Sequence, residues 1–304
     1  MHAGQVDVPA GVVARLVAEQ FPAWRGLPVR PVVSAGTVNA LFRVGEDVVA
    51  RLPLRPAADA GQRAALLHEQ AAARLLAPHL PVAVPEPLGL GEPGRGYPGL
   101  WSVHRWIPGE PADPDALDDP ERLATDLAAV ILALRAVDTG GRRWDGHSRG
   151  GPLAARDDGV RRALAASAGL ADVARLTAVW ERCLRAPVHP GPARWLHADL
   201  MPGNLLLRHG RPAAVIDLGT VCVGDPAVDL MPAWNLLPAP ARATFRQALA
   251  PDAADDADAA WERGRGWALA QAAPALPYYT ETNPQMAATA RRTLQALLAD
   301  RTPP

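Results

Sequence analysis

Three polar side chains stand in otherwise apolar surroundings in the segment 197–219. Asp199 and Asn204 share a short loop, and Asp217 ends a strand that follows a tight turn. Carboxylate and amide oxygens are the hard ligands that Mg²⁺ prefers, and Mg²⁺ usually takes one or two carboxylates together with phosphate oxygens. Hairpin pairing of the strands 204–208 and 213–218 would bring all three side chains to one edge. This layout is typical of phosphoryl transfer, with one carboxylate on the incoming hydroxyl and an Asp and an Asn on the metal.

The composition is that of an ordinary globular protein. The chain has 304 residues, of which 49% are hydrophobic and 21% charged, and this excludes a wholly disordered or fibrous chain. A formal net charge of -1 gives no reason to expect nucleic acid or an anionic membrane as a partner. Every basic residue is an arginine, so that any task usually given to lysine falls to arginine or is left undone.

Cysteine usage and apolar runs bear on the compartment. Cys183 and Cys222 are far apart and lack metal-ligand spacing, so we expect reduced thiols. The N-terminus lacks the pattern of a secretory signal, and the apolar run 127–134 is too short to cross a bilayer. These features predict a cytoplasmic protein, and its size predicts a monomer.

The first hundred residues predict a β-rich lobe. Residues 8–19 have helical spacing, with apolar side chains recurring on one face. Short β-rich runs separated by turn residues then predict an antiparallel meander and a later hairpin. The expected strands are 29–33, 39–44, 47–54, 85–91 and 99–106, with a helix over 60–76 between the meander and the hairpin.

The remainder is mostly helical with one β-rich insert, residues 195–219. We expect helices over 118–137, within 156–185 and from 225 onward, a Gly/Arg-rich loop over 140–151 and an acidic loop over 252–258. The fold class is therefore α+β. The chain divides near residue 107 into an N-terminal lobe, 1–107, and a larger helical lobe, 108–304.

Several segments in order resemble the aminoglycoside phosphotransferase family, small-molecule kinases distantly related to protein kinases. HADLMPGN, residues 197–204, looks like the family's catalytic loop HxDxxxxN, and IDLG, residues 216–219, looks like its metal-binding motif. The segments 33–54, 66–89 and 224–230 are similar to the family's first strands, its N-lobe helix and the stretch after the metal motif. The resemblance covers about residues 30 to 300.

The resemblance implies a bilobal protein-kinase-like fold and a role for each matching residue. Asp199 would be the catalytic base or the group that orients the acceptor hydroxyl, and His197 would support the loop. Asn204 and Asp217 would bind Mg²⁺, and ATP or GTP would be the phosphoryl donor. Asp225 and Asp229 would be structural, the first capping a helix and the second bonding to the catalytic loop.

One position departs from the protein-kinase pattern. A third-strand lysine there holds the α- and β-phosphates and pairs with a helix glutamate. Arg51 stands at that position here, with Glu69 as its pairing candidate, while Arg43 and Arg55 are less well placed. Arginine offers a charged planar fork, so a phosphate contact is chemically reasonable; the alternative is an exposed strand arginine.

Two further segments are expected to bind the nucleotide. Ser34, Gly36 and Thr37 belong to the loop over the phosphates, where turn amides cradle anions without a glycine-rich consensus. The segment with Ser102, His104 and Trp106 would be the hinge that binds the purine through backbone groups. Trp101 and Trp106 bracket this hinge, either lining the base pocket or, the more frequent case, packing in the core.

The sequence leaves the acceptor open. Acidic residues for a polycationic aminoglycoside and aromatic residues for a macrolide or another bulky hydroxylated molecule both occur in the C-terminal half. The acidic candidates are Asp252, Asp255, Asp256, Asp258, Glu262 and Glu281; the aromatic ones are Trp234, Trp261, Trp267, Tyr278 and Tyr279. Acidic runs are usually solvated, and helix aromatics usually core. A basic loop, 141–151, would argue against a polycation if it lines the pocket.

The leading hypothesis is a Mg²⁺-dependent kinase acting on a hydroxyl of a small molecule, an antibiotic for example, with resistance as the result. A metabolic kinase for an amino alcohol or sugar is the second reading, and a catalytically silent nucleotide-binding protein is the third. Intact Asp199, Asn204 and Asp217 count against the third; Arg51 in place of lysine is the feature that favours it.

Overall fold

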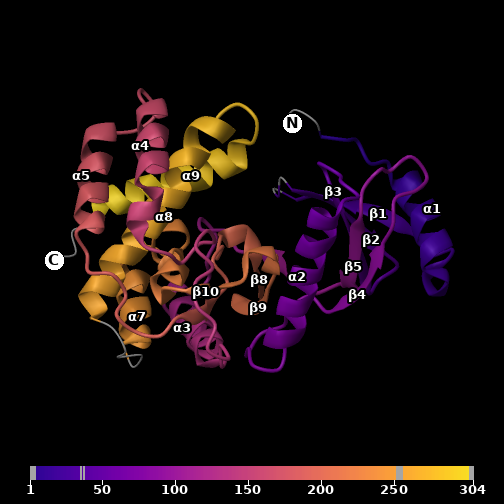
Figure 1. Ribbon diagram of the computed structural model, residues 1–304, viewed down its shortest axis with the longest axis horizontal. Helices are drawn as coiled ribbons and strands as arrows, with labels where there is room; N and C mark the ends of the chain where they lie inside the picture. Colours follow the sequence, from indigo (N-terminus) through magenta and orange to yellow (C-terminus); the bar gives the residue numbers. More distant parts are fainter. Residues whose placement is uncertain (1–4, 35, 37, 251–255, 301–304) are drawn as a thin grey trace. The chain divides into compact units, whose positions relative to one another are not determined.

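The computed structural model describes residues 5–34, 36, 38–250 and 256–300, and the chain forms two compact units (Figure 1). The first contains the chain up to Pro78, Ala83–Gly109 and Ala214–Gly219, and the second contains His79–Val82, Glu110–Ala213 and the chain from Thr220. An antiparallel sheet dominates the first unit and helices the second, which confirms the expected α+β class. The functional division at residue 107 stays a prediction.

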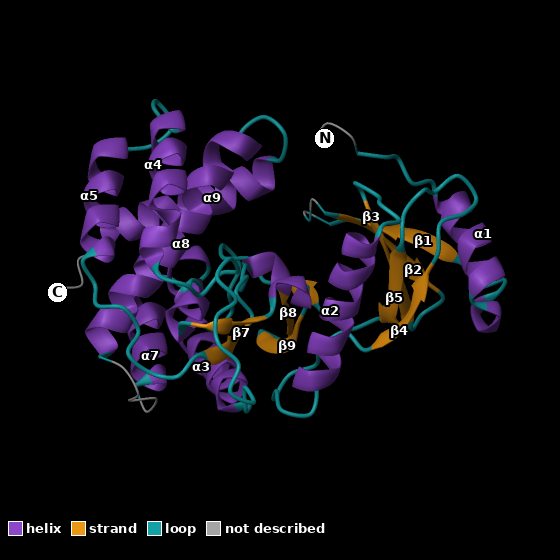
Figure 2. Ribbon diagram, in the orientation of Figure 1, coloured by secondary structure: helices purple, strands orange, loops and turns teal. Residues whose placement is uncertain are grey.

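The first unit is built on a five-stranded antiparallel sheet (Figure 2). Its strands, in spatial order, are β1 (Val29–Val32), β2 (Asn39–Val44), β3 (Val48–Pro53), β5 (Trp101–Arg105) and β4 (Pro87–Gly91). The predicted meander and the later hairpin are both confirmed. The hairpin closes the sheet on β3, so β5 is paired on both sides.

The two faces of this sheet carry different side chains because successive residues of a strand point to opposite sides. In β3, Ala50 and Leu52 are buried in one apolar cluster with Leu16 and Val17 of helix α1 (Ala10–Gln20). Arg51 lies on the other face, where it bonds to helix α2 (Ala60–Leu76). Because side chains alternate along β3, Arg51 points away from the apolar cluster and toward α2.

Helix α2 begins and ends at the residues that the sequence predicts. Asp59 caps its start by accepting a hydrogen bond from the Gln62 amide at 2.8 Å. A capping carboxylate satisfies an amide that has no partner within the helix. Helix α1 begins two residues later than predicted, directly after Pro9, which has no side-chain cap to offer.

Residues 214–219 contact the rest of the first unit through the backbone at Ala83 and the side chain of Arg51. Ala214 forms a parallel bridge with Ala83, and the Val215 amide donates to the Ala83 carbonyl at 3.0 Å. The end of strand β9 (Arg211–Val215) is thereby bound to the segment that follows α2. As a result Asp217, which comes directly after it, belongs to the sheet unit.

The second unit is a helical bundle (Figure 1). Its helices are α3 (Pro120–Ala136), α4 (Asp157–Ala166), α5 (Val173–Leu184), α6 (Pro232–Asn235), α7 (Ala239–Leu249), α8 (Ala257–Tyr279) and α9 (Pro284–Ala299). Helix α8 is central, because α4, α5 and α9 pack against it, while α7 packs against α3. The region 156–185 forms two helices, one of the two predicted arrangements.

Short strands of the second unit flank the loop between residues 196 and 205. β7 (Arg194–Leu196) pairs antiparallel with β10 (Cys222–Gly224), and β8 (Leu205–Arg208) lies between β6 (Glu110–Pro111) and β9. The predicted turn between β8 and β9 is confirmed: His209 and Gly210 both have positive φ, of 53° and 71°. This turn type requires left-handed backbone conformations.

Both cysteines are free thiols, as expected. Burial raises the pKa of Cys183 and of Cys222 to about 12, so both stay protonated at neutral pH. Among the helices that the structure describes, none is both long and apolar enough to span a membrane.

Gly224→Ala is expected to destabilise the second unit. A Cβ at Gly224 would lie 2.5 Å from the Gly150 carbonyl oxygen. Relieving this clash requires the backbone to move, because the oxygen belongs to the main chain. We expect the free energy of unfolding to fall by about 1–3 kcal/mol in urea titrations. Gly159→Ala is the control: it adds a Cβ to α4 in open space and should be neutral or stabilising. Equal stability of the two variants would contradict this packing.

Candidate active site

The loop after β7 carries Asp199 in an unusual backbone conformation. Ala198 has a φ of 63°, which is a left-handed backbone conformation. This conformation is unfavourable in free energy for any residue other than glycine. The loop ends in a short 3-10 turn, Pro202–Asn204, and β8 follows it. The Met201 amide donates to the Asp199 carbonyl at 2.7 Å, which tightens the loop around Asp199.

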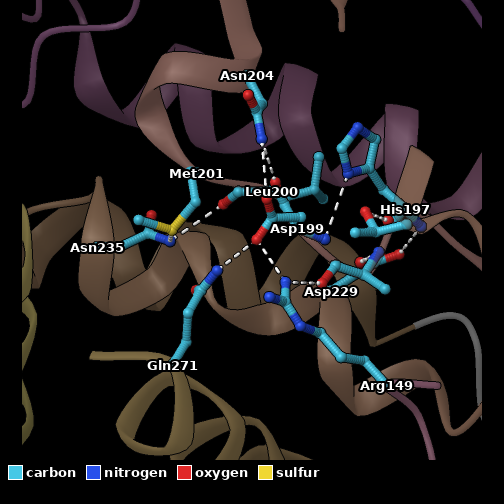
Figure 3. A network of polar contacts seen from close by, with 11 residues as sticks. Arg149, His197, Asp199, Leu200, Met201, Asn204, Asp229, Asn235 and Gln271 are labelled. Carbon is cyan, nitrogen blue, oxygen red and sulfur yellow. Dashed lines mark hydrogen bonds and ion pairs between the residues drawn. The ribbon is translucent and has the colours of Figure 1, made fainter. Parts of the chain in front are cut away.

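The carboxylate of Asp229 is hydrogen-bonded to the backbone of this loop. Its two carboxylate oxygens accept hydrogen bonds from the amides of His197 and Ala198, each at 2.8 Å (Figure 3). Burial raises the pKa of Asp229, opposed by His197 and by these two amides. The expected bond between Asp229 and the catalytic loop is confirmed. Asp225 is a cap, as expected: it accepts from the Ala227 amide at 2.9 Å at the start of the next turn.

His197 is buried and lies against the loop backbone. Its Nδ1 accepts from the Asp199 amide at 3.3 Å, and its carbonyl accepts from the Thr220 hydroxyl at 2.9 Å. These contacts join His197 to the backbone of the loop; its supporting role stays a prediction.

The Asp199 carboxylate is surrounded by hydrogen-bond donors (Figure 3). Oδ1 accepts from Arg149 Nη1 and from Gln271 Nε2, and Oδ2 accepts from Asn204 Nδ2 at 3.2 Å. Asn204 Nδ2 also donates to the Asp199 carbonyl at 2.9 Å. Asp199 and Asn204 are thus brought together, as their shared loop predicted.

Arg149 and Gln271 are contacts that the sequence did not identify. The sequence identifies 141–151 as a basic loop relevant to the acceptor, but nothing in it distinguishes Arg149 from Arg142 or Arg143. Gln271 carries a weak signal, because it is a lone polar residue in the apolar second half of α8. Neither signal reveals its partner.

A second polar cluster lies in the sheet unit. Arg51 donates through Nη1 to Glu69 and through Nη2 to Asp217 at 3.3 Å, with only 12% of its side chain exposed. Burial opposes the charged guanidinium, but Glu69 and Asp217 outweigh it and raise the pKa of Arg51. The predicted pairing of Arg51 with Glu69 is therefore confirmed; a phosphate contact of Arg51 stays a prediction. Arg43, the weaker candidate, pairs with Glu46 instead.

Asn204 and Asp217 have the donor chemistry that Mg²⁺ requires. The amide nitrogen of Asn204 is used on Asp199, which leaves its carbonyl oxygen to face a ligand. Asp217 has a φ of 63° and a 42% exposed side chain, and it gives only Oδ1 to Arg51. The described residues contain no cluster of three or more His, Cys, Asp or Glu for a metal. The binding of Mg²⁺ by Asn204 and Asp217 stays a prediction.

The expected phosphate loop lies between β1 and β2. Ser34 and Gly36 are exposed, and the Gly36 amide donates to the Ser34 hydroxyl at 3.0 Å. Thr37 lies outside the described residues. A contact of this loop with phosphate stays a prediction.

The expected hinge begins inside β5. Ser102 and His104 are buried and bond to each other, with 3.0 Å between His104 Nε2 and Ser102 Oγ. The amides of Arg105 and Trp106 donate to the Glu86 and Asp47 carbonyls. These two amides are thus occupied within the unit, and the purine contact expected of the segment stays a prediction.

The two tryptophans that bracket the hinge differ. Trp101 is fully buried and packs edge to face with Phe21 at 5.3 Å, so it belongs to the core. Trp106 is half-buried, with the Arg43 guanidinium 4.9 Å from its ring centre. Packing is thus the right interpretation for Trp101.

The acidic candidates for a polycation pocket are largely used in the fold. Asp256 caps α8, Asp258 pairs with Arg246, and Glu262 pairs with Arg182 at 3.0 Å. Asp252 and Asp255 lie outside the described residues, and Glu281 is exposed. Among the aromatic candidates, Trp234, Trp261 and Trp267 are core residues, Tyr279 is half-buried and Tyr278 is 53% exposed.

A comparison with models of known protein families assigns the chain to one of them. The model of the phosphotransferase enzyme family matches residues 30–267, and the chain belongs to this family. The resemblance seen in the sequence motifs is therefore confirmed. No curated protein matches the chain.

Solved structures with the same fold include antibiotic phosphotransferases. The GDP complex of aminoglycoside 2'-phosphotransferase-IIIa matches with a TM-score of 0.69 at 19% identity, over 97% of this chain and 100% of that one. The GDP and kanamycin complex of APH(2")-IIia matches with a TM-score of 0.68 at 18% identity, over 95% and 99%. Macrolide 2'-phosphotransferase MphH from Brachybacterium faecium, an apoenzyme, is 26% identical, with a TM-score of 0.57, over 94% and 98%. The expected kinase-like fold is confirmed.

Asp229→Asn is expected to loosen the catalytic loop. Asparagine offers one acceptor oxygen, and its NH₂ group would face an amide N–H that then has no partner. We expect unfolding to cost about 1–3 kcal/mol less and the His197 and Ala198 amides to exchange hydrogen faster. Asp172→Asn, at the exposed cap of α5, is the control and should be neutral. Unchanged exchange at both amides would refute the role of Asp229.

His104 makes stability depend on pH in a defined direction. Burial, and then the Arg51 charge, lower the pKa of His104 to about 3, opposed by the Pro85 carbonyl. The unfolded chain, with an ordinary pKa near 6.5, therefore binds more protons. The stabilisation is complete above about pH 6.5 and is lost as the pH falls toward 3.

The comparison of wild type with His104→Gln tests this. Between pH 7 and pH 5 the wild type should lose about 2 kcal/mol relative to the variant in urea titrations. His79→Gln, at an exposed histidine, controls for substitution itself. A stability difference between wild type and His104→Gln that stays constant with pH would show that His104 is not the group concerned.

Proposed function

We propose that this phosphotransferase moves the γ-phosphoryl group of a nucleoside triphosphate to a hydroxyl of a small molecule. The observation that carries the proposal is the Asp199 carboxylate, fixed by Arg149, Gln271 and Asn204 on a loop that Asp229 holds. A pre-oriented carboxylate on a kinase-like loop has the chemistry to orient an attacking hydroxyl.

Asp199 is the catalytic residue in this proposal. The acceptor hydroxyl donates its hydrogen to the carboxylate, which turns the oxygen lone pair toward phosphorus. The acceptor O–P bond forms as the bond between the γ-phosphorus and the bridging oxygen breaks, and the electron pair leaves with the nucleoside diphosphate. The proton passes to Asp199. Positioning of the reactants supplies most of the rate enhancement, because phosphoryl transfer needs little covalent participation from the protein.

Asn204 and Asp217 are the proposed Mg²⁺ ligands. When bound, the ion neutralises charge on the β- and γ-phosphate oxygens. Asn204 has its carbonyl oxygen for this task, and Asp217 has Oδ2, while Arg51 holds Oδ1 of Asp217. The donor set of one carboxylate and one amide oxygen fits the low number of protein ligands that Mg²⁺ takes.

Arg51 supplies the positive charge on the nucleotide side. It uses one nitrogen on Glu69 and another on Asp217, and guanidinium has five N–H donors, so donors remain for phosphate. Ser34, Gly36 and Thr37 form the proposed phosphate loop, and the stretch with Ser102, His104 and Trp106 the proposed base side. ATP and GTP both remain candidates as donor.

A bulky acceptor with little positive charge is favoured over a polycation. The contacts of Asp199 include the Arg149 cation, which would repel ammonium groups. Gln271 lies on α8 two turns from Tyr278, whose exposed ring offers apolar surface to an acceptor. The 26% sequence identity with a macrolide 2'-phosphotransferase also supports a macrolide-like acceptor. Macrolides are therefore the first acceptors to test.

A phosphoryl-transfer screen tests the proposal. ATP and GTP, each with Mg²⁺, are offered with macrolides, aminoglycosides, amino alcohols and sugars, and products are detected by mass spectrometry as the gain of one phosphoryl group. We expect a macrolide product. Transfer to an aminoglycoside or to a metabolite alone would overturn the acceptor class but leave the kinase. Binding of neither nucleotide would contradict the kinase and favour a catalytically silent protein of the same fold that binds another ligand.

Two substitutions separate the proposed roles. Asp199→Ala should lower transfer by about two orders of magnitude or more, while nucleotide binding stays nearly intact. Asp217→Ala should instead weaken Mg²⁺-nucleotide binding, measured by calorimetry. Equal loss of binding and transfer in Asp199→Ala would show that its role is wrongly assigned. Unchanged binding and turnover in Asp217→Ala would remove Asp217 from the metal site.

A further inference from the structure

The Gly/Arg-rich loop before α4 is ordered by its own contacts. Asp145 Oδ1 accepts from the amides of His147 and Ser148 at 2.9 and 2.8 Å. The Ser148 carbonyl accepts from Trp144 Nε1 at 3.0 Å and from Arg156 at 2.9 Å. A segment with this many internal hydrogen bonds has a defined path, although its composition is that of a flexible linker.

The end of the loop is fixed against strand β10. Gly150 has a φ of 99°, its carbonyl accepts from the Asp225 amide at 2.8 Å, and Gly224 lies against its backbone. The Cys222 thiol donates to the Arg149 carbonyl at 3.0 Å. Because both glycines lack a Cβ, the two backbones approach closely and fix the Cα of Arg149 relative to β10.

From this fixed point the Arg149 side chain reaches the catalytic loop. Nη1 donates to Asp199 Oδ1 and also to the Ala198 carbonyl at 2.8 Å, and 37% of the side chain is exposed (Figure 3). Gln271 donates to the same carboxylate oxygen from α8. Two donors from separate elements therefore converge on Oδ1.

The two oxygens of Asp199 are consequently unequal. Oδ1 accepts two hydrogen bonds, one of them charge-assisted, whereas Oδ2 accepts, among the described residues, only the 3.2 Å bond from Asn204. A carboxylate oxygen has two lone-pair sites, so Oδ1 is saturated and Oδ2 has one site left.

We infer that Arg149 is a positioning residue for the transfer reaction. It and Gln271 hold Asp199 by Oδ1, so that Oδ2 is the oxygen that receives the acceptor hydroxyl. This inference rests on the proposed function of Asp199. Arg149 keeps its own protons throughout; the proton released by the acceptor goes to Oδ2, and the guanidinium keeps the neighbouring Oδ1 in place while this happens.

The test compares Arg149→Ala with Arg143→Ala, which removes the same charge from an exposed site on the same loop. We expect Arg149→Ala to lower kcat about 10- to 100-fold, with the KM for nucleotide unchanged, because a misplaced carboxylate affects orientation and not nucleotide binding. Arg143→Ala should keep the wild-type kcat. Guanidinium salt added to Arg149→Ala should restore part of the lost rate, and it should restore none in Asp199→Ala.

Gln271→Ala adds a second, independent measurement. If Arg149 and Gln271 hold the same oxygen, their substitutions are coupled, and the double variant loses a different factor in kcat from the product of the single losses. The ratio of transfer to acceptor-independent nucleotide hydrolysis should fall in all three variants, because water needs less orientation than the acceptor.

Two results would overturn the inference. One is a kcat of Arg149→Ala equal to that of Arg143→Ala. The other is a loss of transfer with an equal loss of nucleotide binding and thermal stability and no rescue by guanidinium, which would make Arg149 merely structural. If the wild type itself binds nucleotide but transfers nothing, or if Asp199→Ala is fully active, the proposed function of Asp199 fails first, and this inference fails with it.

Discussion

The buried carboxylate of Asp229 is the interaction on which the catalytic loop depends. Both of its oxygens are bonded to consecutive backbone amides, His197 and Ala198, and this pair of bonds holds Ala198 in its left-handed conformation. Without such support a non-glycine residue would leave that region of backbone space. The direction in which Asp199 leaves the loop, and with it the contacts of its carboxylate, follows from this one buried charge.

Local patterns in the sequence were enough to predict much of the fold and part of the site. Strand alternation and turn residues predicted the sheet, and the spacing of the catalytic-loop motif predicted that Asp199 and Asn204 would meet. The pairing of Arg51 with Glu69 was predicted from the resemblance to kinases, in which a third-strand lysine pairs with a helix glutamate. For the sheet and the loop, the partners lie on neighbouring elements or in one loop, so periodicity and motif spacing carry the information.

The remainder depends on tertiary contacts that periodicity does not encode. Arg149 is 50 residues before Asp199 and Gln271 is 72 residues after it, and only the packing of the helical unit brings them together. The acidic stretch at the start of α8 was open to two interpretations until its caps and ion pairs were seen. Likewise, Asp217 joins the sheet unit through the backbone contact at Ala83, which no motif indicates.

The sequence contains no lysine, and both polar clusters use arginine as a bridge between two acceptors. Guanidinium does not titrate in the physiological range, so the positive charge at these clusters is constant. It also lacks an ε-amine. Lysine acetylation and amine-directed acyl probes therefore find no side-chain target in this sequence. The positive charges in these two clusters can thus be removed by mutation, but lysine-directed reagents do not neutralise them.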